Sequence, residues 1–259
     1  KEYLEFNRED SDLYELYRNG EEVTNFTITD YTHEDSREGF KLEIRGLHGG
    51  HSGGDIHLER GNALKLVGII LKHASERFEI NISDLQGGLK INAITREADV
   101  VFTSDDQANF VKWFESVSHE LKVQYEISDS NLEFNLIPTK MDAILDCETS
   151  QAIIDTLFML PYGVIQKSMA IEDLTITSAN IGTASLKEDT FEIDVSLRAT
   201  QSFVIENIMA QVAWISKQTG FEVTYSSKYP GWNYEKDSKF RERLFEVHEK
   251  LRNTKMKEV

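Results

Sequence analysis

The sequence predicts an α+β fold, a two-layer sandwich in which a mixed or antiparallel sheet carries helices on one face. Strand-like and helix-like segments alternate along most of the 259 residues, and several strand-like segments are joined by short turns. Short turns connect antiparallel neighbours, whereas a parallel pair needs a long crossover. The second half of the chain repeats the rhythm of the first, as expected for distant copies of one β-α-β unit.

The N-terminal segment and the first clear strand differ sharply in pattern. Residues 1–38 are strongly acidic and weakly periodic, so we expect irregular structure there, apart from one short strand near Val23–Ile28. From Phe40 onward apolar residues alternate with charged ones, and Leu42 and Ile44 continue the alternation. This period of two is typical of a half-buried β-strand.

Helical and strand-like periodicities predict the remaining elements. In order, they predict a helix over 61–78, a strand over 87–103, a helix over 104–123, a strand over 131–138, a helix over 149–160, paired strands over 173–186 and 190–200, a helix over 201–220, a strand over 221–227, a turn over 229–232 and a helix over 239–253. Ser104 suits the N-cap of the second helix, and Gly220 suits the C-terminus of the fourth. Pro138 and Pro161 should end the elements that precede them.

Composition narrows the range of partners. The formal net charge is −17 and the pI is about 4.8, which argues against nucleic acid and anionic membranes, because phosphate groups are bound by Lys and Arg. No apolar run approaches the roughly 20 residues that a membrane-spanning helix needs. The single cysteine, Cys147, excludes an internal disulfide and fits a reducing compartment, so we expect the cytoplasm. The chain begins at Lys1 without a basic-then-apolar leader, which indicates a processed start or an internal piece of a longer protein.

The stretch Gly46–His57, GLHGGHSGGDIH, lies between a predicted strand and a predicted helix. Its GHSGG part satisfies the serine-nucleophile pattern G-x-S-x-G at Ser52. In a nucleophile elbow, however, the strand runs directly into the serine and the helix begins at once. Here several residues intervene on both sides, so a serine hydrolase using GHSGG is the weaker alternative.

The histidines of this stretch allow two other kinds of chemistry. His48, His51 and His57 could bind a metal ion, but their spacing in a glycine-rich loop matches no rigid ligand geometry. The pair His33-x-Asp35 also has a ligand spacing, in polar sequence that is more typical of a solvated loop. Alternatively, one histidine donates a hydrogen bond to a developing oxyanion while the glycines permit close approach. The alternative without a catalytic or metal-binding role is a glycine-rich turn whose histidines lie on the surface.

Six motifs in a fixed order carry a resemblance to a known family. They are GLHGGHSGGDIHLERGNALKL, GGLKINAITREA, LPYGVIQKS, TSANIGTASL, VSLRAT and YPGW. Over roughly 40–232 the chain resembles the aminoacyl-histidine dipeptidases, the cytosolic non-specific dipeptidases among the dinuclear zinc metallopeptidases. The resemblance implies a lid domain inserted in a catalytic domain. The flank over 1–38 would belong to or border the catalytic domain, 39–228 would form the lid or dimerisation domain, and 229–259 would re-enter the catalytic domain.

The resemblance also implies site residues. In such enzymes the histidine of GGHSG, here His51, stabilises the oxyanion of the tetrahedral intermediate. The Asn of the NAI segment, here Asn92, and the Arg of the LR strand, here Arg198, hold the C-terminal carboxylate and oxygen of the substrate. A planar guanidinium suits this role because it binds a carboxylate through two parallel hydrogen bonds. Judged from the residues alone, Arg198 could instead pair with a surface carboxylate, and Asn92 could serve a turn.

The metal ligands of the family are missing from this sequence in any suitable context. The family has an early His-x-Asp, a bridging acid, a Glu-Glu pair and a late His, whereas the pair Glu21-Glu22 here follows no apolar strand. We therefore expect two divalent metal ions, zinc by resemblance, in the full-length parent and none in this chain, which alone should be inactive. The parent would hydrolyse Xaa-His and other dipeptides. Its partners would be the dipeptide, the remaining catalytic domain and a second copy bound through the lid. A non-catalytic dimerisation or peptide-binding module is the runner-up.

Overall fold

The structure is a computed structural model that describes residues 20–29, 33–169, 174–187, 190–226 and 237–255. Its elements are β1 (Gly20–Thr29), β2 (His33–Arg45), β3 (Gly50–His51), the short 3-10 helix η2 (Ile56–Leu58), α1 (Ala63–Ser75), β4 (Ile80–Gly87), β5 (Ala93–Ile94), β6 (Ala98–Ser104), α2 (Gln107–Gln124), β7 (Glu133–Leu145), α3 (Cys147–Met159), β8 (Gly163–Lys167), β9 (Thr175–Lys187), β10 (Thr190–Ala199), α4 (Ser202–Thr219), β11 (Glu222–Ser226) and α5 (Lys239–Arg252). The α+β class predicted from the sequence is confirmed. None of the helices in these ranges combines the length and apolarity that a bilayer crossing requires.

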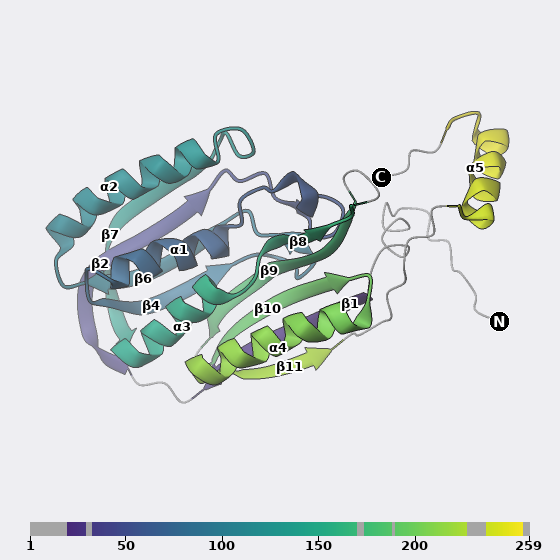
Figure 1. Cartoon of the computed structure of the whole chain (residues 1–259). Coiled ribbons are helices and arrows are strands. Elements are labelled where there is room, and N and C mark those ends of the chain that lie inside the picture. The colour runs from purple at the N-terminus through teal and green to yellow at the C-terminus, as the bar shows by residue number, and fades with distance from the viewer. Residues whose placement is uncertain (1–19, 30–32, 170–173, 188–189, 227–236, 256–259) are drawn as a thin grey trace.

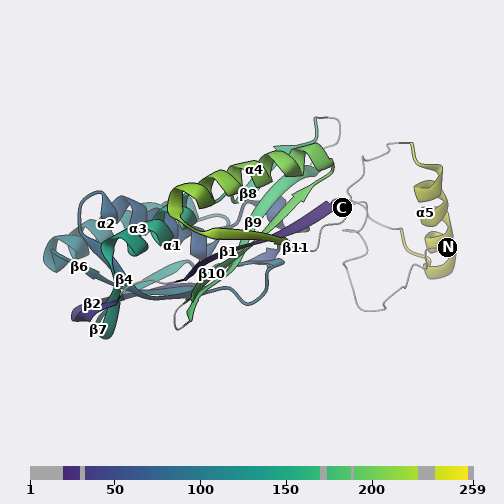
Figure 2. The same ribbon diagram turned by 90° about the horizontal axis from the view of Figure 1, so that it is seen from below.

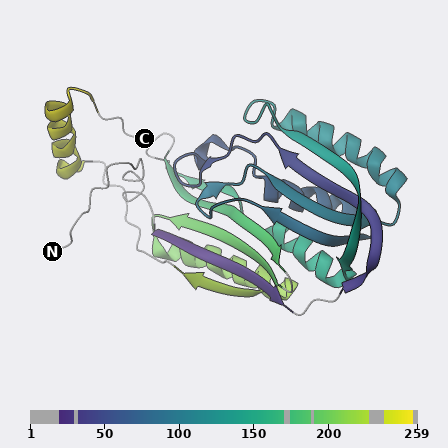
Figure 3. The same ribbon diagram turned by 180° about the vertical axis from the view of Figure 1, so that it is seen from behind.

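The strands form one broad sheet, and the helices α1 to α4 cover only one of its faces (Figures 1 and 2). Nine strands of the described residues pair in the order β11-β1-β10-β9-β4-β6-β2-β7, with β8 attached to β9. All of these pairings are antiparallel. The other face of the sheet is seen in Figure 3 and is called the open face below. The architecture is therefore the predicted two-layer sandwich, with an antiparallel rather than a mixed sheet.

The sheet consists of two modules with the same β-α-β-β-α-β topology. The inner module comprises β2, α1, β4, β6, α2 and β7, and the outer module comprises β1, α3, β9, β10, α4 and β11. Counted outward from their junction, both modules place their strands in the order second, third, first, fourth. The repeated rhythm of the sequence thus reflects a repeated unit. The inner module is inserted between the first strand and the first helix of the outer one.

The two modules join where β4 pairs with β9. The pairing is short and consists of Gln86 opposite Ser185 and Gly87 opposite Ala184. The apolar core nevertheless continues across this seam, because side chains from both modules belong to one cluster beneath the helices. In the inner module the core centres on Phe110, whose ring packs against those of Phe40, Phe102 and Phe114 and others. The seam is therefore a packed junction with few backbone hydrogen bonds.

Three strands, the two-residue β3 and the longer β4 and β8, were not expected from the sequence, and the strand expected over 87–103 is in fact a loop followed by β5 and β6. In β4 the alternation of apolar residues fails because the register against β6 shifts between Ile82 and Asp84. Such a bulge moves the following side chains to the opposite face. A search for strict alternation therefore overlooks β4.

Several boundaries also differ from the expected ones. The strand β7 continues through Pro138, opposite Phe40, because an edge strand tolerates the missing N–H of proline. Asp106 is the N-cap of α2, since its side chain accepts a hydrogen bond from Asn109 N, while Ser104 ends β6. Gly220 does end α4 in the left-handed conformation, with φ 77°. The turn expected over 229–232 lies outside the described residues.

The sheet also reaches further toward the N-terminus than the expected domain boundary at residue 39. The strand expected near Val23–Ile28 is present as the longer β1, which pairs with β10 over its whole length. The strand β2 begins at His33, not at Phe40. Residues 20–29 and 33–38, placed in a flank by the sequence, are therefore part of the sheet.

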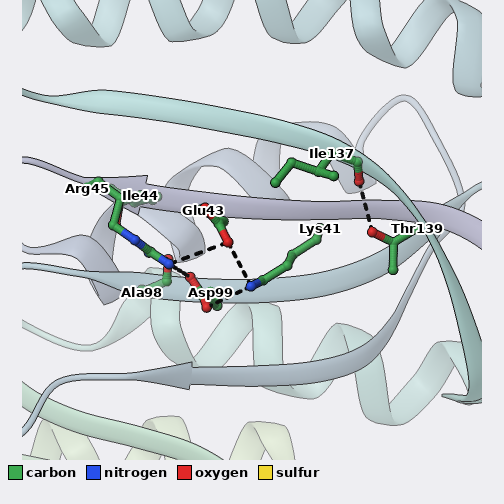
Figure 4. Close-up of polar contacts among 8 residues, drawn as sticks. All are labelled: Lys41, Glu43, Ile44, Arg45, Ala98, Asp99, Ile137 and Thr139. Carbon is green, nitrogen blue, oxygen red and sulfur yellow. Dashed lines mark hydrogen bonds and ion pairs between the residues drawn. The ribbon is translucent and has the colours of Figure 1, made fainter.

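The open face of the inner module is polar. Lys41, Glu43 and Arg45 alternate along β2 with buried Leu42 and Ile44. They form an ion network with Asp99 of β6, in which Lys41 Nζ lies 2.7 Å from Glu43 Oε1 and 3.1 Å from Asp99 Oδ2 (Figure 4). The hydrogen bonds to these two carboxylates raise the pKa of Lys41. This face therefore keeps its charges paired.

Candidate functional site

The Gly/His stretch is an ordered connection between β2 and α1. It forms the two-residue strand β3 and the short helix η2, and Asn62 then caps α1 by accepting a hydrogen bond from Lys65 N at 3.1 Å. Gly50 adopts φ 140°, and a Cβ there would lie 2.7 Å from Asp55 Oδ2. Only glycine allows this tight path. The stretch is thus an ordered turn between a strand and a helix.

His51 is held in a defined orientation by the backbone around it. Its N–H donates to Asp55 Oδ2 at 2.8 Å, and its Nδ1 accepts hydrogen bonds from Gly53 N at 3.1 Å and Gly54 N at 3.2 Å. An imidazole nitrogen that accepts N–H groups carries no proton, so the neutral ring carries its proton on Nε2. His51 is therefore a hydrogen-bond donor through Nε2.

Asp129, in the loop between α2 and β7, holds the connection between β2 and α1 at two points. Its buried carboxylate accepts hydrogen bonds from His48 N at 2.8 Å and from Gly61 N at 2.7 Å, and from Ser128 Oγ at 2.8 Å. Charge-assisted bonds of this kind are stronger than neutral ones. The position of the stretch is therefore fixed from a distant loop that sequence patterns did not single out.

The three predicted site residues are linked through Ser52, the neighbour of His51 in the chain. His51 in β3 lies opposite Ala93 in β5, and Ser52 N donates to Asn92 O at 2.9 Å. Arg198 Nη2 lies 3.4 Å from Ser52 Oγ. The guanidinium is buried, with Arg198 only 3% exposed, whereas Asn92 is exposed. His51 and Asn92 come from the inner module and Arg198 from the outer one, so this cluster lies at the seam.

A second set of buried polar residues, Asn62 and Asn180, lies under the loop that carries Asn92. Asn180 Nδ2 donates to Ile91 O at 3.1 Å and to Ala93 O at 2.9 Å, and Asn62 Nδ2 donates to Ile181 O at 2.8 Å. Sequence reasoning missed both asparagines. Asn180 lies within the TSANIGTASL motif and Asn62 directly before a helix, so a signal existed for each. No comparable signal marks Asp129.

The geometry does not fit a serine hydrolase. Ser52 is only 1% exposed, and its hydroxyl lies beside Arg198. The ring nitrogen Nδ1 of the adjacent His51 accepts backbone N–H groups, so it is not available as a base for Ser52. A nucleophile must be reachable by substrate and activated by a base. The contacts of Ser52 and His51 therefore do not support the serine alternative.

The three histidines of the stretch do not form a metal centre. His48 Nδ1 faces Asp129 at 3.6 Å, while His51 Nδ1 faces backbone amides. Within the described ranges, no group of three or more His, Cys, Asp or Glu side chains is arranged to hold a metal ion. The residues His33 and Asp35 lie in β2, opposite Leu145 and Ala143. The described residues therefore do not fit the dinuclear metal site implied by the resemblance.

An imidazole N–H and a guanidinium are both suited to bind negatively charged oxygen atoms. Arginine is rarely buried unless its charge is used, and its fork matches the two oxygens of a carboxylate. A histidine donor is suited to an oxygen on which charge develops during a reaction. In this structure, however, the guanidinium of Arg198 is as buried as the hydroxyl of Ser52, so binding of an acidic group there would require the seam to open.

Comparisons with known proteins show similarity to peptidases in sequence and in fold. Residues 42–129, within the inner module, match the peptidase dimerisation domain family. The cytosol non-specific dipeptidase of Escherichia coli (strain K12) is 30% identical over 219 residues, which are 83% of this chain and 45% of that protein. The crystal structure of aminoacylhistidine dipeptidase from Vibrio alginolyticus superposes with a TM-score of 0.82 and 25% identity, covering 92% of this chain and 50% of that chain. The chain thus spans about half the length of the relatives that it matches. Its sequence and its fold are thus similar to those of these dipeptidases, and part of its inner module matches a peptidase dimerisation domain.

Proposed function

We propose that the chain is the lid portion of a metal-dependent dipeptidase that hydrolyses Xaa-His and other dipeptides. The observation that supports this most strongly is that Ser52, the neighbour of His51, contacts both Asn92 and Arg198 at the seam between the modules. These residues lie far apart in the sequence, and the contacts of Ser52 with Asn92 and Arg198 join them. Such a cluster is what a lid needs to close over one end of a short peptide.

Each residue has a distinct role in this proposal. His51 donates its Nε2 proton in a hydrogen bond to the carbonyl oxygen of the scissile bond as negative charge develops there. Arg198 and Asn92 hold the C-terminal carboxylate of the dipeptide and a neighbouring oxygen. Because a dipeptide is short, the carboxylate clamp and the oxyanion donor must lie close together. A contiguous cluster satisfies that requirement.

The metal ions belong, in this proposal, to the half of the parent that lies outside this chain. The described residues offer no suitable ligand group, so hydrolysis requires that other half, and the chain alone should be inactive. The relatives in the comparisons are named as dipeptidases, and one of them is named as cytosolic. We accordingly propose the cytoplasm as the location of the parent.

A role in self-association is the second proposal, and it is compatible with the first. The match of the inner module to a peptidase dimerisation domain supports it. The sheet has free outer strands at both ends, β7 and β11, in the described part of the chain. Unpaired strand edges can add a strand from another molecule. Sedimentation equilibrium of the chain tests this, and a purely monomeric species at all concentrations would contradict it.

The test of the main proposal is His51→Ala in the complete parent enzyme. Loss of an oxyanion donor should lower kcat roughly 10²–10³-fold and change KM little, because the bond forms mainly in the transition state. His57→Ala, in the same stretch but outside the cluster, is the matched control and should retain activity. A loss confined to KM, or an equal loss in His57→Ala, would refute the role of His51.

A further inference from the structure

We infer that Asn180 is the positioning residue of the proposed site, acting on substrate through Asn92. The inference rests on the proposed function. Asn180 is 1% exposed and lies on β9 of the outer module. Its amide nitrogen donates to the carbonyls of Ile91 and Ala93, the two residues that flank Asn92. One buried side chain thus holds the peptide groups on both sides of a residue that contacts substrate.

The loop over 88–95 lies very close to β9. A Cβ on Gly182 would lie 2.4 Å from Ile91 O, and a Cβ on Gly88 would lie 1.9 Å from Gly182 O. Contacts of this length are not tolerated by a side chain, so at these two glycines the strand and the loop meet through backbone. Asn180 is the side chain of β9 that bridges to the carbonyls at the tip of the loop.

The same contacts also fix the histidine strand. The loop residue Asn92 accepts a hydrogen bond from Ser52 N through its carbonyl, and β5 pairs with β3, in which Gly50 lies opposite Ile94 and His51 opposite Ala93. A shift of the loop therefore shifts both Asn92 and the strand of His51. The chain of contacts runs from Asn180 to the loop, and from the loop to the histidine.

The chemistry of the amide explains why the residue is an asparagine. Its nitrogen offers two hydrogens for two carbonyls, and its oxygen lies 3.4 Å from Asn62 Nδ2. Aspartate, of the same shape, has no donor and would place a negative charge against two carbonyl oxygens. Leucine would leave both buried carbonyls without this partner. Asn180→Asp is therefore the sharpest variant and Asn180→Leu the second.

The structural part of the test uses this chain and amide hydrogen exchange. Loss of the two bonds should speed exchange of the Ser52 amide, which donates to Asn92 O, by roughly tenfold or more, while amides in the middle of α1 change little. Thr95→Val is the matched control. It removes the hydroxyl bonds of a similarly buried residue to Ile181 O and Gly182 O without touching the flanks of Asn92. Unchanged exchange at Ser52 in both Asn180 variants would overturn the inference.

The functional part uses the complete parent and compares dipeptides with their C-terminal amides. Asn180→Asp should lower kcat/KM for the dipeptide about as much as Asn92→Ala, and the double variant should lose little more than either single one, because both changes act on one contact. Additive losses, or a loss that Thr95→Val reproduces, would overturn the positioning role. If Asn92→Ala leaves the dipeptide kinetics unchanged, the proposed role of Asn92 fails and the functional part of the inference fails with it. If Asn92→Ala is impaired and Asn180→Asp is not, the inference alone fails.

Discussion

At the scale of single residues, the site depends on hydrogen bonds that fix the orientation of individual side chains. His51 is one case, since two backbone amides occupy Nδ1 and leave the proton on Nε2. Arg198 is another, since its guanidinium is 3% exposed and its Nη2 lies 3.4 Å from Ser52 Oγ. Both side chains are thus held in defined positions by their neighbours.

The carboxylate role of Arg198 leads to a prediction about substrate choice. Arg198→Lys in the complete parent should lower kcat/KM for dipeptides about 10- to 100-fold. A lysine would replace the two parallel hydrogen bonds of the guanidinium with a single point contact to the carboxylate. Dipeptide amides, which lack the carboxylate, should be much less affected. Arg45→Lys, within the ion network of the open face, is the control. Equal losses on acids and amides would show that Arg198 does not hold the carboxylate.

At the scale of elements, the helix pair α1–α3 contains a lysine in an unusual position. Lys65 Nζ in α1 donates hydrogen bonds to Leu160 O at 2.8 Å and to Phe158 O. These bonds cap the C-terminal end of α3. The carbonyls at a helix C-terminus lack partners within the helix, so they attract a cation. Burial nevertheless lowers the pKa of Lys65 to about 8. The capping contact is thus made by a group that burial makes easier to deprotonate.

This lowered pKa predicts a pH dependence of stability. Between pH 8 and the ordinary value of 10.5, the unfolded chain binds a proton at Lys65 that the folded chain has released. The free energy of unfolding should therefore rise with pH across this window, by at most about 3 kcal/mol from this group. Urea unfolding at pH 7 to 10 measures it as the difference between wild type and Lys65→Met. Lys72→Met, which removes the ion pair with Asp155 on the same two helices, is the control. Parallel curves for wild type and Lys65→Met would contradict the prediction.

Local pattern predicted the type of most elements, and it failed where a tertiary neighbour decided the outcome. The helices α1 to α5 and the hairpin of β9 and β10 follow from spacing alone, because their buried faces have regular periods. The strand β4 was missed because a bulge interrupts its alternation, and β7 was cut short because a proline is tolerated at a sheet edge. Both exceptions depend on which strand lies alongside, which a single segment does not record.

The candidate site was predictable only in part, for a similar reason. His51 stands in a conspicuous stretch, and the resemblance added Asn92 and Arg198. Their proximity depends on Ser52, and on an inter-module contact through Asn180 that no local pattern encodes. A residue in a distinctive motif, such as His51, is easier to recognise in the sequence than a residue that positions it through tertiary contacts, such as Asn180.

At the scale of the whole molecule, the central feature is one module nested inside another. The inner module has its own helices, its own four strands and the aromatic cluster around Phe110. The site requires both modules, since Arg198 and Asn180 lie in the outer one. The inner module could therefore fold without forming the proposed site, which needs residues from both modules.

This separation predicts the behaviour of the excised inner module. A polypeptide of residues 33–145 should unfold in one cooperative transition in urea, because it contains all four strands of its half of the sheet and the aromatic cluster around Phe110. Its Ser52 amide should exchange faster than in the whole chain, since Asn180 is missing. Circular dichroism and amide exchange measure the two properties. A gradual, non-cooperative transition would show that the inner module depends on the outer one for folding.

The nesting also constrains the order of events during synthesis. Thr29 of β1 pairs with Thr190 of β10, so the first strand leaves the ribosome about 160 residues before its partner. At typical translation rates of about 5–20 residues per second, the delay is roughly 8–30 s. During this interval the inserted unit can complete its sheet while β1 still has neither neighbour. The nascent protein thus assembles from its middle outward, and the waiting strand is the segment that a chaperone would have most reason to shield.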